Sequence, residues 1–98
     1  MTTKVIFKKF PEGDVIALFP DLPGTNNPYK DCLSYMRVGQ HGSASLKLSG
    51  LKPAKPSEYQ DLLDELISIG YGDLEIVRKF SKNSLKNRIA QINGSTNC

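Results

Sequence analysis

The only histidine of the chain, His41, lies in the run Val38-Gly39-Gln40-His41-Gly42, directly after a strand-like segment. An imidazole with an unperturbed pKa of about 6.5 can act as a general acid or base, and the glycines let the backbone bend and expose it. Cys32, at the start of that segment, is the internal thiol that could act as a nucleophile beside it. Catalysis would also need an orienting carboxylate, and no motif supplies one. A catalytic role is the weaker interpretation, so we predict that Gln40 and His41 hold a turn in shape or present it to a partner.

Metal ligation is not predicted. A metal site combines several thiolates, imidazoles or carboxylates, whereas this chain has one histidine and no closely spaced pair of cysteines. The carboxylates at 58, 61, 64 and 65 are interpreted as an ordinary solvated helix face. We therefore expect neither a metal nor a cofactor.

Three further side chains near the glycine-flanked turn are of the types that anchor protein interfaces. Tyr29 stands in a proline-rich loop, and Tyr35 and Arg37 stand in the strand-like segment before the turn. Two of the four candidate anchors Tyr29, Tyr35, Arg37 and His41 could equally be core or structural residues. Together with the turn they form the predicted protein-binding surface, which comprises Tyr29, Tyr35, Arg37, Gly39, Gln40, His41 and Gly42.

The net charge of +3 conceals a segregated pattern. Residues 1–56 contribute +4, residues 57–76 contribute −6, and residues 77–98 contribute +5. Basic side chains beside phenylalanines can contact phosphates and stack on bases, so nucleic-acid binding is the alternative hypothesis. The pI of about 8.9 is lower than is typical of a dedicated nucleic-acid binder. The candidate residues for this alternative are Lys8, Lys9, Arg78, Lys79, Lys82, Lys86 and Arg88.

The N-terminal half predicts strands. Residues 4–10 and 15–19 are rich in Val, Ile and Phe, and the four residues Pro11-Glu12-Gly13-Asp14 between them suit a hairpin loop. Three prolines in 20–30 exclude a helix or a central strand, so this segment is predicted to be an exposed loop. Residues 32–38 alternate as a third strand with two faces. The segment 39–50 is rich in glycine and serine, and only Leu46 and Leu48 hint at a strand there.

The C-terminal half predicts two helices and one strand. Ser57 stands three residues before Gln60, which matches a capping box, and apolar residues at helical spacing follow to Gly70. A helix is therefore predicted over 58–69, a strand over 74–80, and a final helix over 81–92. This order predicts an α+β fold in which an N-terminal hairpin and further strands form a small antiparallel sheet, packed by one amphipathic helix. We expect one domain over 1–80, followed by a C-terminal helix and tail over 81–98.

The sequence contains no run long enough to cross a bilayer, since its longest apolar run is Val15–Phe19. It also begins without the apolar core of a secretory signal. The two cysteines, Cys32 and Cys98, are too few for a disulfide framework and are predicted to be free thiols. We therefore expect a cytoplasmic protein with no membrane partner.

Three stretches together resemble a family of short uncharacterised proteins encoded by bacteriophages and by mobile elements of Bacteroidota. They are 5–10 with 14–20, 32–35 with 38–42, and 56–59 with 66–72. The resemblance implies no catalytic residues; it implies an accessory protein in the host cytoplasm, with virion association left open. We expect stoichiometric binding to a host or phage protein, with nucleic acid as the alternative partner. An exposed sheet edge would also allow pairing with a second copy.

Overall fold

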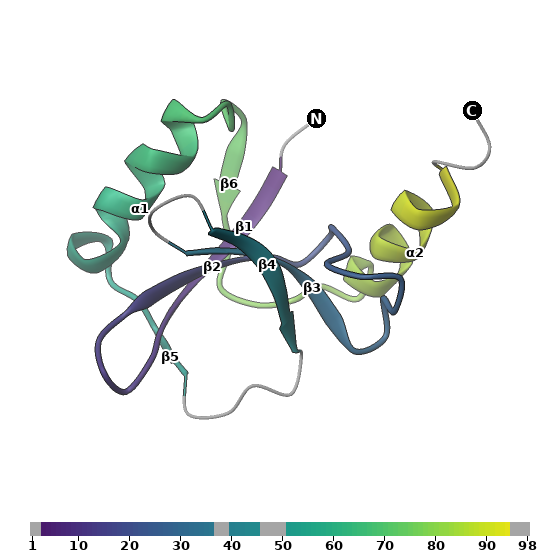
Figure 1. The fold of residues 1–98 in the computed structure, drawn as a ribbon, viewed down its shortest axis with the longest axis horizontal. Coiled ribbons are helices and arrows are strands. Elements are labelled where there is room, and N and C mark those ends of the chain that lie inside the picture. Colours follow the sequence, from purple (N-terminus) through teal and green to yellow (C-terminus); the bar gives the residue numbers. More distant parts are fainter. Residues whose placement is uncertain (1–2, 37–39, 46–50, 95–98) are drawn as a thin grey trace.

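The structure is a computed structural model, and it describes residues 3–36, 40–45 and 51–94. The chain has an α+β fold, as predicted, in which one small sheet is joined to two helices (Figure 1). No helix of the described part combines the length and apolar character that crossing a bilayer would require. The strands are β1 (Thr3–Lys9), β2 (Val15–Phe19), β3 (Asp31–Met36), β4 (Gln40–Ser45), β5 (Lys52–Pro53) and β6 (Leu74–Ile76), and the helices are α1 (Pro56–Ser68) and α2 (Ser84–Gly94).

The sheet is mostly antiparallel, with the strand order β4-β3-β2-β1-β5. The predicted N-terminal hairpin is confirmed, because β1 pairs with β2 in antiparallel register. The other edge of β1 is shared between two short strands. Antiparallel β5 pairs with Lys8 and Lys9, whereas parallel β6 pairs with the stretch from Thr3 to Val5. The edge of β1 is therefore split near its middle, between the end of one partner and the start of the other.

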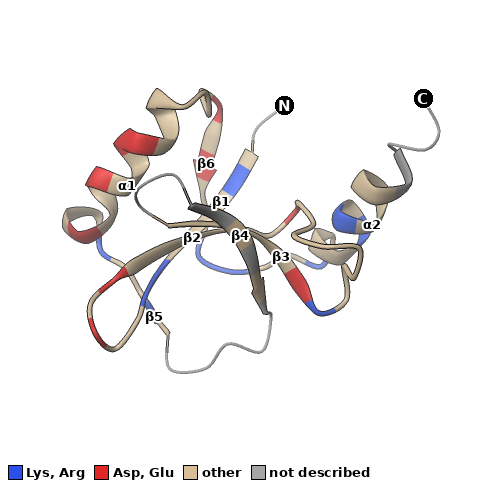
Figure 2. Ribbon diagram, in the orientation of Figure 1, with Lys and Arg blue, Asp and Glu red and all other residues tan. Residues whose placement is uncertain are grey.

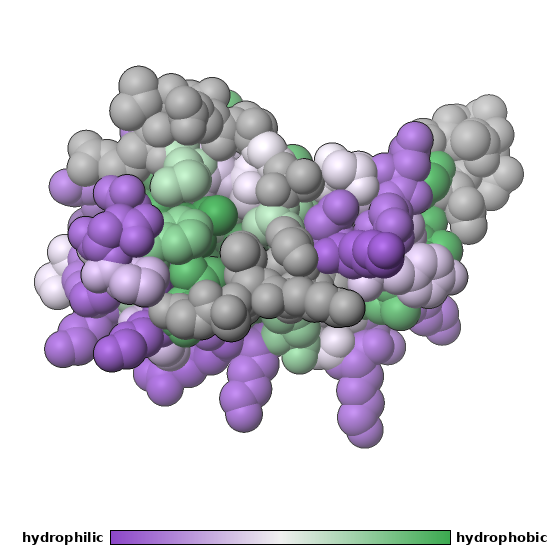
Figure 3. Space-filling view, turned by 60° about the horizontal axis from the view of Figure 1, so that its bottom comes forward, coloured by the Kyte–Doolittle hydropathy of each residue, from purple (hydrophilic) through white to green (hydrophobic). Residues whose placement is uncertain are grey.

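Each face of the sheet buries its own apolar cluster, because side chains alternate along a strand. On one face Phe7, Phe19 and Tyr35 pack with Leu62 and Leu66 of α1. The other cluster comprises Ile6, Ile16, Leu18, Cys32 and Ala44, with Leu51 and Val77 packed against it. The alternation predicted for the third strand is confirmed by Tyr35 in the first cluster and Cys32 in the second. In Figure 3, which turns the bottom of the molecule forward, an apolar patch lies left of the centre, with hydrophilic side chains to its left and below it.

Helix α1 starts earlier than predicted, and its N-cap is not Ser57. Pro56 occupies the first helical position, where a missing N–H costs nothing because no intrahelical acceptor exists there. The N-cap is thus Lys55, and the Glu58 carboxylate accepts a hydrogen bond from its backbone N–H at 2.9 Å. The helix therefore begins at Pro56, with Lys55 as its N-cap, and not at the capping-box serine that the sequence predicted.

The predicted turn at Gln40, His41 and Gly42 is wrong. These residues form the first half of β4 and pair with Met36, Tyr35 and Ser34 of β3. The pairing is sterically open at Gly42, where a Cβ would meet only the Ser34 Oγ at 3.7 Å. The cross-strand ladder therefore overrides the low strand propensity of a glycine-rich segment. Leu46 and Leu48, the predicted strand fragment, lie outside the described residues.

Two C-terminal elements are shorter or later than predicted. Strand β6 covers only Leu74–Ile76. Directly after it the Val77 N–H donates to the Val5 carbonyl at 2.9 Å, and the chain then leaves β1. Helix α2 starts at Ser84 and not at 81. The Ser84 N–H donates to the Ser81 carbonyl at 3.2 Å and the Ser84 Oγ accepts a hydrogen bond from the Ser81 N–H at 3.0 Å, so the residues before Ser84 form a turn that leads into the helix.

We expect Gly70→Ala to destabilise the protein by about 1–3 kcal/mol and Gly72→Ala to leave stability nearly unchanged. Gly70 ends α1 with φ +122, a conformation that L-residues rarely adopt, whereas Gly72 has no positive φ. A Cβ would meet nothing within 4 Å at either position, so the pair isolates backbone strain. Urea unfolding of both variants measures the difference. Equal midpoints would contradict a backbone requirement at Gly70.

Candidate functional site

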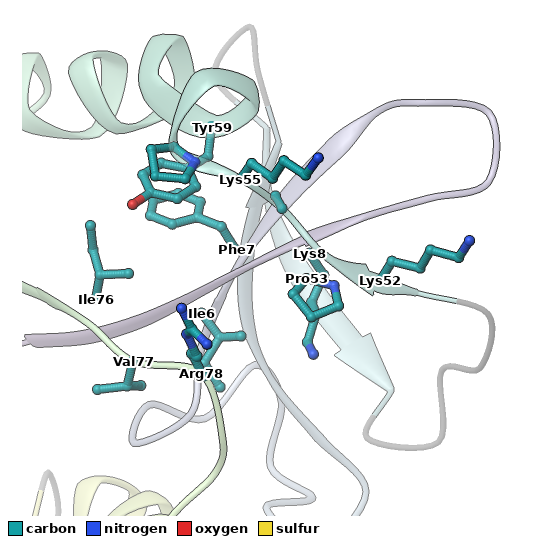
Figure 4. A pocket seen from close by; sticks show the side chains of 12 residues that line it. Ile6, Phe7, Lys8, Lys52, Pro53, Lys55, Tyr59, Ile76, Val77 and Arg78 are labelled. Carbon is teal, nitrogen blue, oxygen red and sulfur yellow. The ribbon is translucent and has the colours of Figure 1, made fainter.

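A groove of about 500 Å³ lies at the split edge of β1. Its lining comes from three places: the middle of β1, the segment that runs from β5 into α1, and the end of β6 (Figure 4). The groove exists because β5 and β6 pair with different halves of β1 and then diverge. Its floor and walls include Ile6, Phe7, Pro53, Tyr59, Ile76 and Val77.

The wall beside α1 is held by an aromatic pair. The rings of Phe7 and Tyr59 are stacked, with centroids 4.3 Å apart and planes at 10°. This stack joins β1 to the first turns of α1 and contributes about 0.5–1.5 kcal/mol beyond burial. In Figure 4 the Tyr59 hydroxyl points into the groove, toward the side where Ile76 lies. Ile76 is 43% exposed, so the opposite wall offers an apolar side chain to solvent.

Four cations surround this apolar surface, and the lining contains no carboxylate. None of these four side chains has an ion-pair partner among the described residues. The Glu58 carboxylate, whose pKa the charge of Lys55 helps to lower, offsets part of their field, and the remaining positive charge attracts negative groups toward the apolar floor. The charged ends of Lys52 and Lys55 extend away from the floor in Figure 4. The four cations, called the cationic rim below, are Lys8, Lys52, Lys55 and Arg78.

A neighbouring lysine is not part of the rim because it is already paired. The Lys9 ammonium donates to the Glu58 carboxylate, the one ion pair within the described segments. This hydrogen bond is the largest influence on Glu58 and lowers the pKa of its carboxyl, with the Lys55 backbone N–H adding to the effect. Lys9, predicted as a phosphate contact, thus holds the start of α1 against β1.

The other predicted nucleic-acid residues do not form one surface. Lys8 and Arg78 meet at the groove, whereas Lys79, Lys82 and Lys86 are exposed but do not line it. Figure 2 shows basic positions spread over β1, the segment after β6 and α2. These residues were predicted together because they lie close to one another in the sequence, but in the fold they lie on different parts of the surface.

Arg88, also predicted to contact nucleic acid, is buried, and that prediction is wrong. Only 3% of the residue is exposed. Its Nη1 donates to the Pro20 carbonyl at 2.6 Å and its Nε to the Pro28 carbonyl at 2.9 Å. Its guanidinium also lies over the ring of Phe80, 5.8 Å from the centroid. Arg88 therefore fastens both ends of the loop between β2 and β3 to α2.

The residues of the predicted protein-binding surface differ in how exposed they are. Tyr35 is 1% exposed and donates to the Glu65 carboxylate at 2.5 Å, so it is a core residue and not an interface anchor. Tyr29 is 67% exposed, beside a smaller hollow of about 300 Å³ near Ile89 and Ile92. Gly42 is exposed on β4, and the backbones of Gln40 and His41 belong to the same strand. Arg37 and Gly39 lie outside the described residues.

The proposed pairing of Cys32 with His41 is not supported by the strand register. Cys32 lies opposite Ala44, and His41 lies opposite Tyr35, so the two are not cross-strand neighbours. Burial raises the pKa of the Cys32 thiol to about 11, an effect that the charge of Arg88 partly offsets. A thiol with that pKa is almost wholly protonated at neutral pH and is a poor nucleophile. Among the described residues, no group of three or more His, Cys, Asp or Glu side chains could hold a metal.

Comparisons with protein-family models, with curated proteins and with solved structures found no match to this chain. The groove therefore has to be interpreted from its own residues. Sequence reasoning missed Lys52, Lys55, Tyr59 and Ile76 as surface-forming residues. A signal was present in Lys52-Pro53-Ala54-Lys55-Pro56, since lysine and proline together are typical of an exposed edge segment of a sheet.

Proposed function

We propose that this protein acts by stoichiometric binding to another protein, and that the groove at the split edge of β1 receives an acidic segment carrying an apolar side chain. The observation that supports this proposal is that the groove combines an apolar floor with the cationic rim and that no carboxylate lines it. Apolar burial would supply affinity, and the rim would steer and orient the partner. The setting suggested by the sequence resemblance, a phage or mobile-element accessory protein in the host cytoplasm, is part of the same proposal.

Nucleic acid is the second candidate, and the exposed cations Lys79, Lys82 and Lys86 favour it. Binding of single strands commonly uses aromatic faces on which bases stack. At the groove these faces are occupied, because Phe7 is 4% exposed and its ring stacks on Tyr59. Aliphatic side chains such as Ile76 form the accessible apolar part instead. That surface suits a leucine or isoleucine side chain better than a base.

A labelled peptide with a central leucine pair flanked by aspartates tests the proposal by fluorescence anisotropy. We expect the double variant Lys8→Glu, Arg78→Glu to bind it about tenfold more weakly or worse. Two exposed ion pairs contribute about 0.2–1 kcal/mol each, reversal adds repulsion, and about 1.4 kcal/mol corresponds to tenfold. The matched control is Lys82→Glu, Lys86→Glu, which makes the same charge change at exposed positions outside the groove.

Ile76→Ser separates the two candidate functions. It removes an apolar contact of the groove and leaves every cation in place, so peptide binding should weaken while binding of a labelled oligothymidine should not change. Binding of the oligothymidine alone, lost in the Lys82→Glu, Lys86→Glu variant, would replace the proposal with nucleic-acid binding. Circular dichroism of each variant checks that the fold is retained.

A further inference from the structure

The outward face of α1 carries exposed acids that no cation of the described residues neutralises. Leu62 and Leu66 face the core, and helical periodicity places Asp61 and Asp64 on the opposite side. Both acids are exposed, and neither forms an ion pair with a described residue; Gln60 donates a hydrogen bond to Asp64 at 2.9 Å. Figure 2 shows acidic positions along α1 and basic positions on β1, in β5 and in the segment that enters α1.

An apolar side chain accompanies these acids. Ile67 lies one helical turn beyond Asp64 and is 52% exposed, so it offers an apolar surface to solvent beside these acids. Asp61, Asp64 and Ile67, called the acidic face below, thus combine negative charge with an apolar group on one side of α1. The groove has positive charges and no carboxylate, whereas the acidic face has carboxylates, so the charges of the two surfaces are complementary, and each surface also has an apolar part.

The acidic face cannot reach the groove of its own chain. Lys55 and Tyr59, at the start of the same helix, form part of the groove, and Tyr59 packs toward the core as Leu62 does. A rigid helix cannot turn its opposite side toward a surface that its own first turn lines. The complementary charges can therefore meet only between two molecules.

We propose that a second copy of this chain docks its acidic face into the groove, so that the protein self-associates through α1. This inference rests on the proposed function, because it names one occupant of the same groove. Self-association occupies the groove and competes with an outside partner. Charge complementarity selects the second copy, since the rim is cationic without a lining carboxylate and the acidic face is unpaired.

Two charge-reversed variants test the docking by sedimentation velocity at low and high salt. The groove variant carries Lys8→Glu with Arg78→Glu, and the face variant carries Asp61→Lys with Asp64→Lys. We expect wild type to associate as concentration rises and to dissociate as salt rises, and each variant alone to associate at least tenfold more weakly. An equimolar mixture of the two variants should associate again, because each supplies the charge that the other needs.

Glu12→Lys with Asp14→Lys is the matched control, since it makes the same charge change in the exposed loop between β1 and β2 and should associate as wild type does. Wild type that stays monomeric at every concentration overturns the inference, as does a mixture that fails to restore association. The labelled acidic peptide keeps the two proposals apart. A monomeric wild type that binds the peptide overturns self-association alone, whereas a face variant that cannot bind the peptide overturns the proposed function.

Discussion

Arg88→Met is expected to lower the free energy of unfolding by about 3 kcal/mol. The arginine donates to the carbonyl oxygens of Pro20 and Pro28, and both prolines are buried. Hydrogen bonds from a charged donor contribute about 1.5–3 kcal/mol each, and acceptors left unpaired inside the protein keep their desolvation penalty. Methionine fills similar volume and removes the cost of burying a guanidinium, which offsets part of the loss. Urea unfolding followed by circular dichroism measures the net effect.

Arg88→Lys is the informative second variant. Lysine keeps the charge, but a single ammonium cannot reproduce the planar fork that reaches two carbonyls at once. Its stability should lie between those of wild type and Arg88→Met. Lys86→Met, at an exposed position of the same helix, should be within about 0.5 kcal/mol of wild type. If Arg88→Met were as stable as wild type, Arg88 would not be the residue that fastens the loop between β2 and β3.

Phe19→Ala should be the other large loss, about 3–5 kcal/mol. Phe19 is fully buried at the end of β2, and its ring stacks on Tyr71 with centroids 5.1 Å apart. Truncation removes apolar contacts and leaves a cavity in the cluster beneath α1. It also uncovers the face of the Tyr71 ring on which Phe19 stacks. Because burial raises the pKa of the Tyr71 hydroxyl, solvent entering the cavity should also move that pKa back toward its ordinary value.

Tyr29→Ala provides the aromatic control, because Tyr29 is 67% exposed. Its free energy of unfolding should stay within about 0.5 kcal/mol of wild type. Thermal or urea unfolding gives the stabilities, and absorbance titration of tyrosine gives the pKa. A loss below about 1 kcal/mol for Phe19→Ala would be inconsistent with its place in the core.

The pattern of apolar residues was sufficient to predict the fold class, the hairpin and both main helices. Burial has a period of two along strands and of about 3.6 along helices, so Tyr35 and Cys32 could be assigned to opposite faces from the sequence. Strand β4 could not be predicted this way. Its residues Gln40–Ser45 have few apolar side chains, and they form a strand because β3 offers an edge to pair with.

The candidate site was largely beyond sequence reasoning. Lys8 and Arg78 were predicted as cationic contacts, but Lys52 and Lys55 join them only because β5 and β6 pair with the same strand. Arg88 was wrongly predicted to lie on the surface, because the neighbouring residues in the sequence do not distinguish a buried arginine from an exposed one. Its acceptors lie more than fifty positions away, at Pro20 and Pro28. Long-range pairing, which local patterns do not encode, decides both cases.

The split edge of β1 also constrains the order in which the chain can fold. Strands β1 and β2 are adjacent in sequence, so their hairpin can form as soon as both have been synthesised. The opposite edge of β1 must wait for β5 and then for β6, which ends at Ile76. Until then the first strand of the protein presents an unpaired edge, the kind of surface that joins chains into aggregates. The lysines Lys4, Lys8 and Lys9 on β1 place positive charge along that edge during the interval.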